Sequence, residues 1–248
     1  MQKPGFSMAL RTLFALLAMP AVAACAPVTN NGVVAHAAVP APRTDAPLAS
    51  HSGRTTTVLA GGCFWGMQWV FEHVPGVTNL TSGYSGGVAA TASYGQVSEA
   101  DTGHAEAVRI AYDPSKVTYG QLLRVYFSVA TDPTELDRQG PDAGTQYRGV
   151  IFYADAEQEK IAKDYVAQLA ASHAFAAPIV TQIVPFKAFY PAEDYHQDYA
   201  RLNPGALYIA INDAPKVIAL QRELPALYSA QPVIWHAEHP TTIMVDLH

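Results

Sequence analysis

The chain has 248 residues and a formal net charge of −6, and 50% of its residues are hydrophobic while 15% are charged. This balance excludes a disordered or fibrous protein and suffices for one domain of ordinary size with additional segments. The acidic excess argues against nucleic acid and anionic membrane surfaces as partners, because both repel a negative surface.

The first 24 residues have the pattern of a secretory signal peptide. Lys3 and Arg11 precede an uncharged apolar run over residues 12–24, which is too short to cross a bilayer comfortably. Residues 1–24 are therefore expected to be removed during export, and the mature protein is expected in the periplasm.

Two processing routes fit the residues that follow. Val22-Ala23-Ala24-Cys25 resembles a bacterial lipobox, in which cleavage leaves Cys25 as a lipidated N-terminus tethered to a membrane. The alternative is cleavage after residues 35–37, an A-x-A pattern that would release a soluble protein. We favour the lipid anchor over this route and over a structural role for Cys25. Both processing routes leave Cys63 as the sole free thiol, since the chain has two cysteines.

Residues 25–54 are predicted to form a flexible linker. They are rich in Ala, Pro, Asn, Gly, Ser and Thr and have almost no large apolar side chains. Such a linker would hold a folded domain away from a membrane.

The segment 55–228 is predicted to be one folded domain, followed by a coil tail over residues 229–248. Strands are expected at residues 55–60, 105–112, 148–153, 179–184 and 207–211, with loops around residues 83–87. Helices are expected from the Cys63 turn to about residue 73, at residues 119–130 and 155–173, from Pro191 onward, and at residues 215–228. This irregular alternation predicts an α+β fold: a two-layer α/β sandwich with a mixed sheet, a ferredoxin-like core and long coil extensions.

Cys63 lies in Gly61–Gly66, at a glycine-flanked turn that opens the first predicted helix. The N–H groups of a first helical turn and the helix dipole favour a thiolate, so we expect the pKa of Cys63 to be lowered. A buried cysteine that acts as a small hydrophobic residue is the alternative. The glycines and the two aromatic neighbours argue against it.

Glu106 has the pattern of a buried carboxyl group. Strand alternation places it on the same face as Val108, Ile110 and Tyr112. Burial raises the pKa of a carboxyl group, so Glu106 would stay protonated near neutral pH and could donate a proton. A strand-end carboxylate that leans into solvent is the alternative.

Other polar and aromatic residues carry less specific signals. Taken alone, Tyr94 and Tyr147 fit packing residues, and Asp142 fits a turn residue. His236 and His239 lack further ligands at a suitable spacing, so no metal site and no cofactor are predicted.

Taken together, seven motifs resemble those of the class A peptide methionine sulfoxide reductases. The resemblance covers about residues 57–225, with the motifs in the same order and at compatible spacing. They are Gly62-Cys63-Phe64-Trp65-Gly66, Gly83–Gly87, Thr102–Glu106, Asp132–Thr134, Gln139–Asp142, Gly144–Arg148 and Ala192–Tyr199.

The resemblance implies a role for each matching position. Cys63 would be the nucleophile, Phe64 and Trp65 would hold the S-methyl group of the substrate, and Glu106 would protonate the sulfoxide oxygen. Tyr94 and Tyr147 would donate hydrogen bonds to that oxygen. Asp142 matches a position in the family's site, and we interpret His196 as structural.

The activity implied is thiol-dependent reduction of the S epimer of methionine sulfoxide, free or in proteins, through a Cys63 sulfenic acid. Its role would be repair of oxidised exported proteins. Many relatives carry resolving cysteines in the C-terminal tail, but no cysteine lies between Phe64 and His248 here. An external reductant, a thioredoxin-like protein or a small thiol, would therefore recycle Cys63. Thr131 and Gly149 depart from the histidine and serine usual in relatives, with little expected effect.

Two other functions are compatible with a reactive Cys63. One is a redox-sensing or binding lipoprotein in which Cys63 merely oxidises. The other is a cysteine acyl-transfer enzyme, in which His104 or His196 would lie within hydrogen-bond reach of the Cys63 sulfur.

Overall fold

The computed structural model describes residues 1–2 and 39–237. The chain divides into two units, Met1–Gly32 and Val33–His248, and the second contains every element described below. The predicted apolar signal run, Cys25 with its lipobox, and His239 lie outside the described residues.

A six-stranded mixed sheet forms the centre of this unit, in the order β7-β6-β1-β3-β2-β8. Within it, β6-β1-β3-β2 is antiparallel throughout, and β7 adds parallel to β6. The sequence of elements β1-α1-β2-β3-α3-β6 in this order is a ferredoxin-like core, which confirms the α+β prediction. The strands are β1 Thr55–Ala60, β2 Val77–Ser85, β3 Ala105–Tyr112, β6 Val150–Tyr153, β7 Gln182–Pro185 and β8 Phe189–Pro191, and a separate pair is β4 Arg138–Gln139 and β5 Asp142–Ala143.

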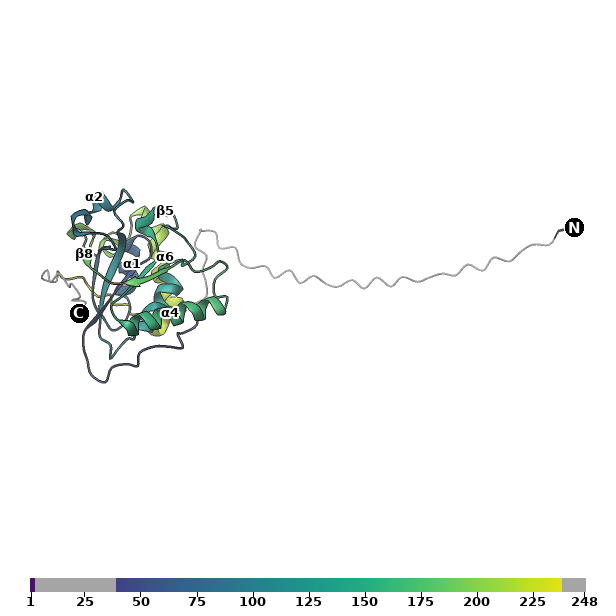
Figure 1. Cartoon of the computed structure of the whole chain (residues 1–248), viewed down its shortest axis with the longest axis horizontal. Helices are drawn as coiled ribbons and strands as arrows, with labels where there is room; N and C mark the ends of the chain where they lie inside the picture. Colours follow the sequence, from purple (N-terminus) through teal and green to yellow (C-terminus); the bar gives the residue numbers. More distant parts are fainter. Residues whose placement is uncertain (3–38, 238–248) are drawn as a thin grey trace. The chain divides into compact units, whose positions relative to one another are not determined.

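Helices pack on one face of the sheet, and Figure 1 shows α1, α4 and α6 beside it. The α-helices are α1 Phe64–Glu72, α2 Tyr94–Val97, α3 Tyr119–Val125, α4 Ala156–Ala171, α5 Tyr199–Leu202 and α6 Ala214–Glu223. Two π-helical turns, η2 Tyr126–Ala130 and η5 Ile209–Asp213, continue α3 and precede α6. The 3-10 turns are η1 Ala89–Thr91, η3 Thr145–Tyr147, η4 Asp194–His196 and η6 Pro225–Leu227.

Alternation along the strands divides the buried side chains between two clusters. Leu59, Val108 and Ile110 join the large cluster under the helices, whereas Val58 and Ala107 join a small cluster on the opposite face. Glu106 is adjacent to Ala107 in β3 and therefore points to the helix side, where α1 begins.

Three predictions about local structure are wrong. Residues 207–211, predicted to be a strand, lead into the π-helical turn η5. A short apolar run is compatible with a strand and with a helix, so the sequence pattern does not distinguish the two. Pro191 ends β8 instead of opening a helix. Gly83, predicted to lie in a loop, belongs to β2, where a Cβ would lie 2.3 Å from the carbonyl oxygen of Tyr190.

The flexible-linker prediction does not hold for residues 39–53. Val39 is buried, the Tyr165 hydroxyl donates to the Pro40 carbonyl at 2.7 Å, and Asp45 accepts from the Gly120 N–H at 2.8 Å. Although this segment has few large apolar side chains, side chains and helix N–H groups of α3 and α4 satisfy its polar groups.

Residues 229–237 run as coil along the end of α1. The Ser229 N–H donates to the His73 carbonyl at 2.7 Å, and the Val233 N–H donates to the Glu72 carbonyl at 2.8 Å. The tail thereby satisfies carbonyl groups that a helix C-terminus leaves without partners. Within residues 1–2 and 39–237, no helix has the length and hydropathy needed to cross a membrane.

Candidate active site

Cys63 is the N-cap residue of α1, directly after the β1 strand and a two-glycine turn. Gly62 has a φ of +96°, and a Cβ there would lie 2.6 Å from Cγ of Gln139. At Gly61 a Cβ would lie 2.9 Å from Cβ of Thr131. Glycine is therefore required at both positions, by space and, at Gly62, also by backbone conformation.

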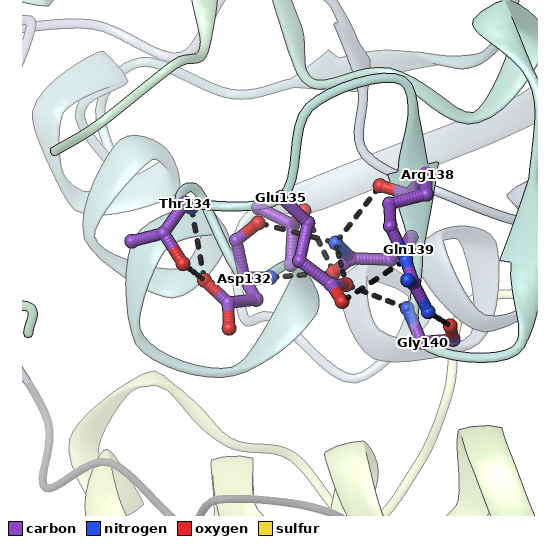
Figure 2. A network of polar contacts seen from close by, with 7 residues as sticks. Asp132, Thr134, Glu135, Arg138, Gln139 and Gly140 are labelled. Carbon is purple, nitrogen blue, oxygen red and sulfur yellow. Dashed lines mark hydrogen bonds and ion pairs between the residues drawn. The ribbon is translucent and has the colours of Figure 1, made fainter. Parts of the chain in front are cut away.

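A polar network holds Gln139 against this turn (Figure 2). The Gln139 amide donates to the Asp132 carbonyl at 3.1 Å and to Glu135 Oε2 at 3.0 Å, and its Oε1 accepts from the Thr131 hydroxyl at 3.0 Å. The same Glu135 oxygen accepts from the Gly140 N–H at 2.6 Å. Because each polar atom of the Gln139 side chain is bonded, the surface that packs on Gly62 is fixed.

One pocket, with a volume of about 210 Å³, contains every catalytic and substrate-binding residue proposed from the sequence. Its lining residues are Cys63, Phe64, Trp65, Tyr94, Glu106, Asp142, Tyr147 and Tyr208. They come from α1, α2, β3, β5, the 3-10 turn η3 and the segment before η5, so segments far apart in the sequence meet at the start of α1.

Glu106 is 3% exposed and accepts a hydrogen bond from the Phe64 N–H on Oε2 at 3.0 Å. Burial raises the pKa of Glu106 to about 8, the Phe64 N–H opposes this shift, and the nearby Asp142 and Asp213 carboxylates add to it. Glu106 is therefore protonated at neutral pH. Since Oε2 accepts from Phe64, Oε1 is the oxygen available to carry the proton.

The expected lowering of the Cys63 pKa is wrong. Burial raises the pKa of the Cys63 thiol well above its ordinary value, and the Glu106 and Asp213 charges raise it further. The Trp65 N–H and the Lys216 ammonium act in the opposite direction but are weaker. The lowering of the Cys63 pKa by the N–H groups of the first turn of α1, a nine-residue helix, is smaller than the raising by burial and by the two carboxyl groups. Cys63 is therefore a thiol at neutral pH.

Three phenol groups face the same volume. Burial raises the pKa of Tyr94, Tyr147 and Tyr208, so all three remain neutral hydrogen-bond donors. The Tyr208 hydroxyl donates to Asp142 Oδ2, which occupies that donor. Tyr94 and Tyr147 have no protein partner for their hydroxyl groups among the hydrogen bonds of the described residues, and they line the pocket with Glu106.

Phe64 and Trp65 form an aromatic wall beside Cys63. The Trp65 ring stacks on Tyr199 with centroids 4.0 Å apart, and its Nε1 donates to His196 Nδ1 at 3.1 Å. Tyr208 meets the Trp65 ring edge-on at 6.1 Å. These contacts fix the ring plane of Trp65 and give the wall a defined shape.

The two candidate imidazole groups are bonded elsewhere. His104 Nδ1 accepts from the Gly87 N–H at 3.2 Å, so its Nε2 donates to the Val88 carbonyl at 3.0 Å. His196 Nδ1 accepts from Trp65, and its Nε2 lies 3.9 Å from Glu193. Neither ring is hydrogen-bonded to Cys63 within the described part of the chain, which argues against the acyl-transfer alternative. Residues 39–237 also contain no group of three or more potential metal ligands.

Sequence reasoning missed Tyr208. Residues 207–211 had been predicted to form a strand, and nothing in that pattern related Tyr208 to Cys63 or Asp142. The helical turn that follows is what directs Tyr208 into the pocket, and its hydrogen bond to Asp142 links two of the lining segments.

Comparisons with known proteins agree with this geometry. The sequence model of a family described as peptide methionine sulfoxide reductase matches residues 55–226. Peptide methionine sulfoxide reductase MsrA 2 of Mesorhizobium japonicum is 57% identical over 182 residues, which are 73% of this chain and 93% of that protein. The protein of the same name from Synechocystis is 46% identical over 195 residues, 78% of this chain and 91% of its own length.

Solved structures give the same result. The crystal structure of reduced Mxr1 from Saccharomyces cerevisiae has a TM-score of 0.55 at 31% identity, covering 65% of this chain and 91% of that one. Methionine sulfoxide reductase A of Corynebacterium diphtheriae has a TM-score of 0.54 at 34% identity, covering 68% and 85%.

Proposed function

Because this chain belongs to the peptide methionine sulfoxide reductase family, we propose that Cys63 attacks the sulfur of S-epimer methionine sulfoxide while Glu106 protonates the sulfoxide oxygen. The observation that carries the proposal is that Cys63 and Glu106 line one pocket, in which Glu106 is 3% exposed. A sulfoxide oxygen leaves poorly until it is protonated or hydrogen-bonded, so acid and nucleophile must act on one substrate molecule.

The proton donor is supported by the burial of Glu106. With a pKa raised to about 8 by burial, the carboxyl group is neutral at pH 7 and can donate from Oε1. The Tyr94 and Tyr147 hydroxyl groups would donate to the same oxygen. Three donors directed at one oxygen stabilise the charge that develops there in the transition state.

Glu106 acts first as a proton donor to the substrate and then as a proton acceptor from Cys63. As Glu106 gives its proton to the sulfoxide oxygen, the resulting carboxylate accepts the proton of the Cys63 thiol. The Cys63 sulfur then bonds to the substrate sulfur, and the substrate sulfur–oxygen bond breaks and releases hydroxide. The hydroxide bonds to the Cys63 sulfur as the bond between the two sulfurs breaks, and the electron pair of that bond returns to the substrate sulfur. The products are the methionine thioether and a Cys63 sulfenic acid, and Glu106 is protonated as at the start.

Epimer choice is assigned to the aromatic wall. Phe64 and Trp65 would receive the S-methyl group, while the donors around Glu106 receive the oxygen. Tyr199 and His196 fix the Trp65 ring, so the positions that receive the methyl group and the oxygen are fixed as well. Only one configuration at the sulfoxide sulfur places its methyl group on the aromatic wall and its oxygen at the donors while its lone pair is directed away from both.

Recycling requires a thiol from outside residues 64–248, since this segment has no cysteine. A first thiol attacks the sulfenic acid sulfur, forming a mixed disulfide and releasing water, and a second thiol then frees Cys63. We assign these thiols to a thioredoxin-like protein or a small thiol. The apolar run at residues 12–24 and the lipobox at Cys25 support a role in repairing oxidised exported proteins, from a membrane tether in the periplasm.

The test uses purified protein and each epimer of methionine sulfoxide separately. One turnover with the S epimer and no reductant is expected to leave a sulfenic acid that dimedone traps on Cys63, and Cys63→Ser is expected to abolish turnover. Turnover retained by Cys63→Ser, or equal rates with the two epimers, would remove the proposal. A dimedone-labelled Cys63 without thioether release would favour the redox-sensing alternative.

A further inference from the structure

A buried ion pair lies behind the first turn of α1 and outside the pocket lining. Asp213 is 0% exposed, its Oδ1 lies 3.4 Å from Lys216 Nζ, and its Oδ2 has no hydrogen-bond partner within the described residues 39–237. Asp213 occupies the N-cap position of α6, yet its side chain makes no capping hydrogen bond. Buried carboxylates are normally hydrogen-bonded by several donors, so capping α6 does not explain this residue.

The carboxylate instead lies against the helix that carries Cys63. A Cβ on Gly66 would be 2.0 Å from Asp213 Oδ1 and 2.6 Å from its Cγ, so only glycine admits the carboxylate here. Gly66 is three residues after Cys63, which is less than one helical turn. Because Gly66 has no side chain, the buried Asp213 carboxyl group can pack against the first turn of α1, close to Cys63.

The ionisable groups around Cys63 come from several elements. Glu106 belongs to β3, Asp142 to β5, Asp213 to the turn η5 and Lys216 to α6. The Glu106 and Asp213 charges raise the pKa of Cys63, whereas Lys216 lowers it. The remaining ionisable groups are the neutral hydroxyls of Tyr94, Tyr147 and Tyr208. Because Glu106 is protonated at neutral pH, its charge acts on Cys63 only at higher pH. Burial raises the pKa of Asp213 too, but the Lys216 ammonium opposes that shift and favours the charged form of Asp213.

We infer that Asp213, paired with Lys216 and packed against Gly66, is a positioning residue that disfavours the Cys63 thiolate and thereby slows oxidation of Cys63 by hydroperoxides, while Lys216 limits this effect. The inference rests on the proposed role of Cys63 as nucleophile. Asp213 acts through the charge state of Cys63 and does not itself touch the substrate.

The reaction of cysteine with hydrogen peroxide explains why a protonated Cys63 thiol would be protected from oxidation. A thiolate sulfur bonds to one oxygen of hydrogen peroxide, the oxygen–oxygen bond breaks, and the other oxygen leaves as hydroxide, which takes a proton to give water. The thiol form does not react appreciably in this way. Since residues 64–248 offer no cysteine to capture the sulfenic acid, a second peroxide would convert it to sulfinic acid, which ordinary thiols do not reverse.

The test compares Asp213→Asn with Lys216→Met in the full chain without substrate. The readout is the pH midpoint of Cys63 alkylation by iodoacetamide, followed by intact mass. Asp213→Asn removes the negative charge and keeps the shape, so the midpoint should fall by about one pH unit, a tenfold gain in thiolate below the midpoint. Oxidation by hydrogen peroxide at pH 7.5 should accelerate severalfold in the same variant.

Lys216→Met should move the midpoint in the opposite direction, because it leaves Asp213 unbalanced. Opposite shifts identify an electrostatic role, since loss of packing would expose Cys63 in both variants alike. Glu72→Gln is the matched control: Glu72 is also buried and lies on α1, but at its far end, and its replacement should leave the midpoint unchanged.

Shifts of equal sign, or a midpoint unchanged in Asp213→Asn, would overturn the inference. If Asp213→Asn fails to fold, Lys216→Met decides alone, and an unchanged or lowered midpoint overturns it. The proposed function fails by a different result, turnover retained by Cys63→Ser, so the two failures are distinguishable.

Discussion

The two ends of α1 each hold a buried carboxyl group with a raised pKa, but their surroundings differ. At the start of the helix, Glu106 accepts from the Phe64 N–H and lines the pocket with Cys63. At the other end, Glu72 is 1% exposed, and burial and the neighbouring Asp198 raise its pKa to about 9, against the opposing Arg201. Residues 229–237 run over this end, where the Trp235 N–H donates to Asp198 at 3.3 Å.

The comparison shows that the cause of a raised carboxyl pKa is distinct from the ability of that carboxyl group to donate a proton to a substrate. Burial produces the shift at both ends, so a shift alone does not mark a catalytic acid. Glu106 differs because it lines an open volume together with a thiol and three phenols, two of which have no hydrogen-bond partner among the described residues. Glu72 faces protein groups only, and the tail closes the helix end beside it.

The largest expected effect is that of Glu106→Gln. The amide keeps the shape but cannot protonate the sulfoxide, so turnover should fall by roughly 10²- to 10⁴-fold. Steady-state rates with S-epimer substrate measure this, and Glu72→Gln is the control, with turnover within about twofold of the parent because its amide touches no substrate. Equal losses in the two variants would mean that burial, not access to the pocket, governs both positions.

The pH dependence of turnover should follow the ionisation of the Glu106 carboxyl group. Since Glu106 donates only when protonated and its pKa is raised to about 8, kcat/KM should decline as the pH rises through about 8. Above that point the decline should approach about tenfold per pH unit. The limb should be absent in Glu106→Gln, and a limb that persists there would assign it to another group.

The two free phenols should contribute smaller amounts. Tyr94→Phe and Tyr147→Phe each remove one donor to the developing charge, and each should lower turnover by about tenfold. Tyr208→Phe is the comparison, because its hydroxyl is already bonded to Asp142. A larger loss in Tyr208→Phe than in the other two would reassign the oxygen-binding donors.

The smallest effect on turnover is expected at the closed end of α1, where the change is one of stability. The folded-state pKa of Glu72 is raised, so its contribution to stability is greatest below pH 4.5 and is lost as the pH rises toward 9. Glu72→Gln should flatten the decline of unfolding free energy over this range, by at most about 1.4 kcal/mol per pH unit. Urea unfolding at several pH values measures the slope, and an unchanged slope would show that Glu72 is not titrating.

Much of the site could be predicted because it depends on local sequence. Strand alternation alone placed Glu106 on the buried face, and the glycines around Cys63 indicated a turn before a helix. The resemblance to the family then supplied roles for Tyr94, Tyr147 and Asp142, whose individual patterns are not specific. All of these residues line the pocket.

What could not be predicted depends on tertiary contacts. The Cys63 pKa is raised by burial in the folded domain and then by Glu106 and Asp213, which come from distant elements, and no helix-start rule includes these effects. Tyr208 and Asp213 reach the site through a π-helical turn that an apolar run does not reveal. The segment at residues 39–53 has a linker composition and is held by polar contacts to α3 and α4.

The most direct test is a titration of the Glu106 carboxyl group itself. ¹³C NMR of protein labelled at glutamate side-chain carboxyl carbons, with Glu106→Gln to identify the resonance, would follow its protonation in the substrate-free enzyme. The account predicts a midpoint near pH 8, with the group neutral at pH 7 in a pocket shared with Cys63. A midpoint near 4.5, the ordinary value, would contradict it, because the proton needed by the sulfoxide oxygen would then be absent.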